Sequence, residues 1–252
     1  MRINPSLQLI VALIACALLP ASVQANTTAQ PRMLVLRQNS MAYGPLIVDV
    51  QKNGIRMDTA DHEKTILCAG PTWDAYLFNN KHKLLYKRPY SVWVKDGVLT
   101  ALSLEWNDFD QKAVHTGELN YAGLSAAEYA FPSSHNGVSN IRFGKIADYV
   151  TTNAVEIDPK IGKFVSSLFD CPLSKMGLLM RFRRIAGRTY GFGLKYNRQD
   201  YIETCLQTTN STYAPLDQKL FLAPTDYKPA SDGAIFVDQS DSNEAFKELI
   251  HP

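Results

Sequence analysis

Residues 44–59 read GPLIVDVQKNGIRMDT, and this stretch decides the fold. Apolar residues at positions 46, 48 and 50 recur with a period of two, which is typical of a strand with one apolar face. Asn53-Gly54 follows at once and is the strongest short signal for a β-hairpin. The alternation resumes at Ile55 and Met57, so the stretch predicts two antiparallel strands that share an apolar face.

The same pattern continues outward from this hairpin. Alternating stretches at 65–69 and 73–78 are separated by the turn signal Gly70-Pro71, and together they predict an antiparallel meander. Ser125-x-x-Glu128 resembles a capping box and predicts a short helix ending near Phe131. Farther along we expect strands at residues 99–106, 112–121, 178–185, 189–196, 201–208 and 219–223.

The clearest helix covers residues 158–170. Asp158 is a good N-cap, and Pro159 takes the first helical position, where its missing N–H costs nothing. Five apolar side chains then lie on one stripe, at Ile161, Phe164, Val165, Leu168 and Phe169. Strands, one amphipathic helix and more strands predict an α+β fold, a single curled antiparallel β-sheet (half-barrel) wrapped on this helix, with short helices besides. We expect one domain over residues 41–252, after an N-terminal tether at 26–40.

Residues 1–25 have the layout of a signal peptide. Arg2 is positive, residues 9–19 are apolar, and the small Ala25 suits cleavage by signal peptidase. The apolar run is too short for a permanent membrane anchor. As an alternative, residues 13–16 (Leu-Ile-Ala-Cys) have the form of a lipobox, in which Cys16 would be lipidated. Either way, the sequence predicts a periplasmic or secreted protein.

Composition and motifs narrow the function. Hydrophobic residues make up 46% of the 252 residues and charged residues 20%, and the net charge is +2, so neither intrinsic disorder nor nucleic-acid binding is expected. The sequence lacks the Gly-x-Ser-x-Gly elbow, His-Glu-x-x-His, the P-loop and a dinucleotide fingerprint. No histidine beyond residue 25 lies two or four positions from another histidine or a cysteine, as a local metal site favours. We expect a non-catalytic protein without metal or cofactor; an enzyme whose site is assembled from dispersed residues is the third interpretation.

Three cysteines follow residue 25, which allows one disulfide and one spare thiol in an oxidising compartment. Cys171 follows the predicted helix and Cys205 lies in a predicted strand, so we expect this pair to tie the helix to the sheet. Cys68 lies in a buried-strand pattern and is expected to be an inert core residue.

Aromatic residues gather around residues 73–106 and 190–201. A strongly curved sheet with one good helix has too few helices to fill its concave face, which leaves an apolar cavity. The residues expected to line this cavity are Leu46, Val48, Ile55, Met57, Trp73, Trp93, Trp106, Ile161, Phe164, Val165, Leu168 and Phe192. The alternative is that these side chains are ordinary core, which would make the protein an envelope structural or protein-interaction module.

A family resemblance rests on the export signal, the hairpin series 44–78, the stretch 93–97 (Trp-Val-Lys-Asp-Gly), the helix 158–169 and the closing segment 221–227. In these features the chain resembles the superfamily of periplasmic lipoprotein carriers, the LolA/LolB-like and LppX-like proteins. The resemblance implies a half-open antiparallel barrel that holds a lipid or lipoprotein acyl chains, with helices plugging its mouth. It also implies a lipid-handling arginine, for which the candidates are Arg56, Arg88 and Arg181. The expected partners are therefore lipid or lipoprotein acyl chains and an envelope protein, and no nucleic acid.

Overall fold

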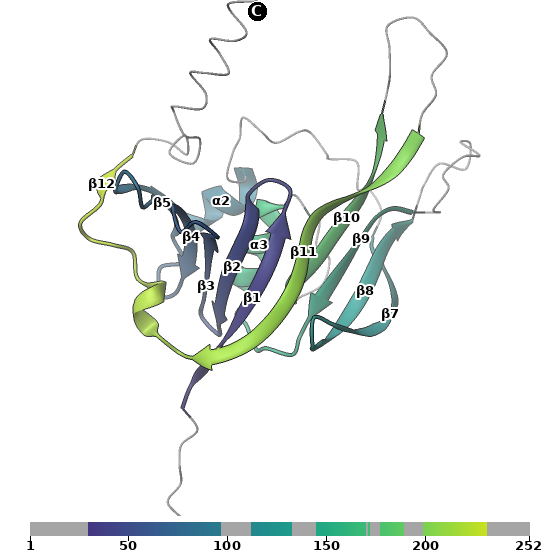
Figure 1. Ribbon diagram of the computed structural model, residues 1–252, viewed down its shortest axis with the longest axis horizontal. Helices are drawn as coiled ribbons and strands as arrows, with labels where there is room; N and C mark the ends of the chain where they lie inside the picture. Colours follow the sequence, from purple (N-terminus) through teal and green to yellow (C-terminus); the bar gives the residue numbers. More distant parts are fainter. Residues whose placement is uncertain are drawn as a thin grey trace, which may run out of the picture. The chain divides into compact units, whose positions relative to one another are not determined.

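The computed structural model describes residues 30–96, 112–132, 145–169, 171, 177–188 and 199–230. In this part of the chain the fold is β-rich: twelve strands form one open, curled sheet, accompanied by two α-helices (Figure 1). Neighbouring strands run antiparallel, except that β12 pairs with β6 in parallel. All of these elements belong to one compact unit that begins at Pro31.

Most strands pair with their neighbours in the chain. The twelve strands are β1 (Arg32–Ser40), β2 (Gly44–Gln51), β3 (Gly54–Thr59), β4 (Lys64–Ala69), β5 (Ala75–Asn79), β6 (Leu84–Arg88), β7 (Val114–Tyr121), β8 (Leu124–Pro132), β9 (Lys145–Thr152), β10 (Leu178–Arg188), β11 (Gln199–Pro215) and β12 (Lys228–Pro229). The helices are α2 (Tyr90–Asp96), α3 (Pro159–Leu168) and the 3-10 helix η1 (Gln218–Phe221). The order across the sheet is β12-β6-β5-β4-β3-β2-β1-β11-β10-β9-β8-β7, so β1 and β11 join two meanders.

Alternation along the first strands gives the sheet an inner and an outer face. The inner face carries Leu46, Val48, Ile55 and Met57, and it shares one apolar cluster with α2 and α3, which lie behind β1–β3 in Figure 1. The outer face carries a smaller cluster, composed of Met33, Leu67, Phe78 and Phe221 of η1 with their partly buried neighbours. Sequence alternation therefore predicts correctly which side chains of β2 and β3 are buried together.

The β2–β3 hairpin confirms the central prediction, but its turn is shifted by one residue. Gln51 pairs with Gly54, so the loop residues are Lys52 and Asn53, and Gly54 is the first residue of β3. A Cβ atom on Gly54 would lie only 2.8 Å from Cδ1 of Phe221. Glycine is therefore needed here for the close approach of Phe221 to the sheet.

Two predicted elements have a different conformation in the structure. Residues 124–132 form strand β8, which pairs with both β7 and β9, so Ser125-x-x-Glu128 does not cap a helix. Pairing on both sides outweighs a local capping signal, because it satisfies the backbone along the whole segment. Residues 219–223 do not form a strand: η1 covers most of this segment, and the Asp217 carboxylate accepts a hydrogen bond from the Lys219 amide at 2.9 Å.

Strand β1 lies within the range that we assigned to a tether. Leu34 and Leu36 have no exposed surface, and β1 pairs with both β2 and β11, so residues 32–40 belong to the middle of the sheet. Polar residues obscure this strand in the sequence: Gln38 is buried and donates a hydrogen bond to Thr208 Oγ1 at 2.9 Å.

Three predictions fall outside the described residues: the signal peptide with its alternative at Cys16, and the strands at 99–106 and 189–196. Among the helices that are described, none is both long and apolar enough to span a bilayer.

Candidate apolar binding face

The inner face is built from rows of side chains that run across the strands. Successive strand pairs align one row from β1 to β6, composed of Leu34, Val50, Ile55, Cys68, Ala75 and Arg88. A second row consists of Leu36, Val48, Met57, Ile66, Leu77 and Tyr86. Directly paired side chains on one face lie about 4.5–5.5 Å apart at Cβ, so each row packs side by side. Together the two rows make a continuous surface that is apolar from β1 to β5.

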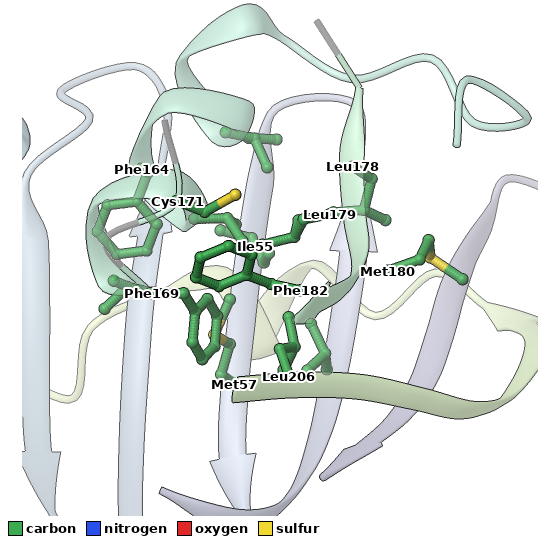
Figure 2. Packing of buried hydrophobic residues seen from close by; sticks show 14 of the residues in the cluster. Ile55, Met57, Phe164, Phe169, Cys171, Leu178, Leu179, Met180, Phe182 and Leu206 are labelled. Atoms are coloured by element: carbon green, nitrogen blue, oxygen red, sulfur yellow. The ribbon is translucent and has the colours of Figure 1, made fainter. Parts of the chain in front are cut away.

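The predicted stripe of helix α3 belongs to the same apolar cluster as these rows. Asp158 is its N-cap, as expected, with Oδ1 accepting a hydrogen bond from the Lys160 amide at 2.9 Å. The side chains that face the sheet are buried, namely Ile161, Phe164, Val165 and Leu168. Figure 2 shows Phe164 and Phe169 in one cluster with residues of β3, β10 and β11.

Helix α2 packs against α3. Trp93 has no exposed surface and stacks on Phe164, with ring centroids 5.1 Å apart and planes at 24°. One turn earlier, the Tyr90 hydroxyl donates a hydrogen bond to the backbone oxygen of Lys160 at 3.1 Å. Burial raises the pKa of Tyr90 to about 12, so this hydroxyl stays protonated and able to donate. Two side chains of α2 thus contact residues on successive turns of α3.

Trp73 was predicted to begin a strand, but it lies in the turn before β5. Its φ is 61°, and its amide donates a hydrogen bond to the Ala69 carbonyl at 3.0 Å. The indole is nevertheless buried in the inner cluster, and the Lys160 amino group lies 5.0 Å from the ring centroid. The turn therefore directs this aromatic ring toward the covered face.

Ten of the twelve predicted lining residues belong to one cluster, while Trp106 and Phe192 lie outside the described residues. The prediction missed a second group in the same cluster, from β9, β10 and β11: Tyr149, Phe182 and Leu206. Phe182 was detectable, because it alternates with the two arginines on either side of it.

In the described part of the chain, the lining residues pack against one another and leave little space. None of the ten is more than 7% exposed. Two surface hollows, of about 270 and 340 Å³, lie elsewhere. The first lies beside the start of α3 and is lined by residues that include Val155 and Pro159, and the second, at the β1–β2 turn, includes Tyr43 and Lys64. The inner face is therefore closed in this conformation.

The three candidate arginines do not all lie on the same face of the sheet. Arg56 is on the outer face, where its Nε lies 2.7 Å from Asp58 Oδ2. Arg181 alternates with the inner residue Phe182 and binds Asp148, with 3.1 Å between Nη2 and Oδ1. Arg88 stands at the end of the first inner row. Strand register therefore places one of the three, Arg88, on the inner face.

The predicted disulfide is not formed. Cys68, Cys171 and Cys205 are all buried, and no disulfide joins any two of them. Cys205 is the extra residue of a β-bulge. Leu206 pairs with Phe182 and Thr204 pairs with Arg183, so the register between β11 and β10 skips Cys205. The link was inferred only from Cys205 lying in a predicted strand, and a bulge bends that strand locally. Burial raises the pKa of Cys68 to about 12 and that of Cys205 to about 11, so both thiols are poor nucleophiles.

No group of three or more histidine, cysteine, aspartate or glutamate side chains comes together as metal ligands would, within the residues that the structure describes.

Comparison with known proteins gives distant structural likenesses only. No protein-family model matches the sequence, and no curated protein is significantly similar to it. The crystal structure of an uncharacterized conserved protein from Thermus thermophilus is 11% identical, covers 89% of this chain and 98% of its own, and has a TM-score of 0.38. A domain from Vibrio parahaemolyticus, described as an outer membrane lipoprotein-sorting protein, is 11% identical, covers 76% of this chain and 87% of its own, and has a TM-score of 0.24. At such low TM-scores neither likeness decides the function, which we infer from contacts within this chain.

Proposed function

We propose that this is an exported, non-catalytic protein that binds or carries an apolar ligand, such as a lipid or the acyl chains of a lipoprotein. The ligand lies on the inner face of a half-barrel wrapped on α3. The observation that carries the proposal is an apolar surface spanning several strands that has only two short helices over it, of seven and ten residues, in the described part of the chain.

The energetics of an exchange between helix and ligand support this proposal. Burying the four side chains Ile161, Phe164, Val165 and Leu168 is worth about 6–12 kcal/mol, at about 1.5–3 kcal/mol each. An acyl chain of about 14 methylenes gains about 11 kcal/mol when it leaves water, at about 0.8 kcal/mol each. Since the two quantities are similar, the gain from burying an acyl chain offsets most of the burial lost when the stripe of α3 leaves the inner face.

The test is to look for bound lipid directly. The protein is purified from its export compartment, extracted with organic solvent and analysed by mass spectrometry, and its uptake of a fluorescent fatty acid is then titrated. We expect lipid in the extract and saturable uptake at about one ligand per chain. Absence of both would refute the carrier function.

A structural or protein-interaction module is the second candidate. The observation in its favour is the closed inner face, where none of the ten described lining residues is more than 7% exposed. Such a module takes up neither lipid nor dye, so the same titration distinguishes the two functions.

A further inference from the structure

One hydrogen-bond donor inside the inner cluster has no acceptor. The indole Nε1–H of Trp93 makes no hydrogen bond to any residue that the structure describes, although the side chain has no exposed surface. Buried donors are nearly always paired, because an unpaired donor loses its bond to water on folding and gains nothing in return. An acceptor brought in by a ligand would satisfy this group.

The indole ring is held in place, so its N–H points in a defined direction. The ring stacks on Phe164, with 5.1 Å between centroids. The backbone amide of Trp93 donates a hydrogen bond to the Pro89 carbonyl at 3.0 Å, which is part of the first turn of α2. In the closed state this donor therefore has a defined position, and leaving it unpaired costs free energy that a bound acceptor would recover.

The surroundings favour a ligand that is apolar along its length and carries an oxygen at one end. Trp93 and Phe164 belong to the same apolar cluster as the inner rows of the sheet. The nearby Tyr90 hydroxyl is already engaged with the Lys160 carbonyl. The exposed Lys160 amino group lies over the Trp73 ring, one turn of α3 before Phe164. A single unpaired donor within an otherwise apolar cluster suits a ligand that is apolar and carries one oxygen acceptor.

We infer that the ligand is an acyl chain that ends in a carboxyl or ester group, and that its carbonyl oxygen accepts the hydrogen bond of the Trp93 indole. This inference rests on the proposed function and names the chemical class of the cargo. Trp93 then determines specificity: it favours acyl compounds over plain hydrocarbons of the same length. A hydrocarbon leaves the indole N–H unpaired.

The experiment compares ligands with and without the carbonyl group. Diphenylhexatriene, a fluorescent hydrocarbon, reports occupancy of the apolar face, and oleic acid, methyl oleate and 1-octadecene compete with it. In Trp93→Phe, which keeps an aromatic ring to stack on Phe164, we expect oleic acid and methyl oleate to bind about five- to tenfold more weakly. The competition by 1-octadecene stays within about twofold of wild type. A neutral hydrogen bond, as to the ester, contributes about this factor, and one to the ionised carboxylate of oleic acid contributes more.

Two further variants separate the loss of the hydrogen-bond donor from other effects of the substitution. Benzothienylalanine at position 93, in which sulfur replaces the N–H, removes the donor while keeping the shape of tryptophan, and we expect the same selective loss. Lys160→Met separates the two sources of the carbonyl: a free carboxylate loses affinity and an ester does not. Equal affinities in wild type and both Trp93 variants would overturn the inference, as would an equal loss for all three competitors. If wild type does not bind diphenylhexatriene at all, the carrier function itself fails.

Discussion

Phe164→Ala tests whether the stripe of α3 competes with a ligand for the inner face. Phe164 has no exposed surface and stacks on Trp93. Its truncation leaves a cavity in a closed core, and we expect it to lower the free energy of unfolding by about 3–5 kcal/mol. If a ligand must displace α3, the same change weakens the competing contact. A loss of about 3 kcal/mol in helix docking then raises the apparent affinity by up to about a hundredfold.

Phe221→Ala is the matched control. Phe221 is also a buried phenylalanine, at 6% exposure, but it packs on the outer face against Met33, Leu67 and Phe78. We expect it to lose stability by a similar amount and to leave ligand affinity unchanged.

Two measurements on each protein decide the matter: the denaturant midpoint with its slope, and the titration with a fluorescent fatty acid. Circular dichroism confirms that each variant is folded before the titration. Tighter uptake in Phe164→Ala alone supports competition on the inner face. Stability losses in both variants, with no uptake by either variant or by wild type, would refute this reasoning and favour the filled-core module.

Three further predictions follow from individual contacts. Non-reducing peptide mapping should show no link between Cys171 and Cys205, and both thiols should react with a thiol reagent only after denaturation; a linked peptide would contradict the absence of a disulfide between these two residues in the structure. Gly54→Ala should destabilise the protein by about 1–3 kcal/mol, because its Cβ would lie 2.8 Å from Phe221 Cδ1, and trimming Phe221 to leucine in a double-mutant cycle should relieve most of that cost. Burial raises the pKa of Asp49, so native Asp49 holds its proton more tightly than the unfolded chain does. Its contribution to stability therefore falls as the pH rises from the ordinary aspartate pKa through the raised pKa of the folded state. Asp49→Asn should therefore raise the denaturant midpoint at neutral pH, and the gain should disappear below the ordinary aspartate pKa; a gain independent of pH would show that charge burial is not its cause.

Local patterns predicted well those elements whose partners are close in the sequence. The β2–β3 hairpin follows from alternation and a turn signal within sixteen consecutive residues, 44–59. Helix α3 follows from its N-cap, the proline at its start and a stripe with helical spacing. In both cases a single segment contains all the residues that predict the element. The turn or the N-cap forms its backbone hydrogen bonds within the same segment as the apolar pattern.

Predictions failed where distant segments determine the conformation. The capping signal at Ser125 lies in β8, because β7 and β9 both pair with that segment. Residues 32–40 were assigned to a tether, but they form β1. The partners of Gln38 in this strand come from β10 and β11, which lie far away in the sequence. The link between Cys171 and Cys205 was inferred without knowledge of the bulge at Cys205.

For the candidate site, too, the sequence predicted features of single elements and missed the contacts between distant elements. The sequence by itself determined that the apolar faces of β2, β3 and α3 would be buried, because a period of two or of 3.6 assigns each side chain to one face of its own element. Only the tertiary structure decided that these faces meet in one cluster with Trp93 of α2, that Arg88 rather than Arg56 or Arg181 ends an inner row, and that the Trp93 N–H is left without an acceptor among the described residues. Register across the sheet and the docking of two helices bring together residues far apart in the chain, and a periodic pattern within one segment carries no information about its distance from another.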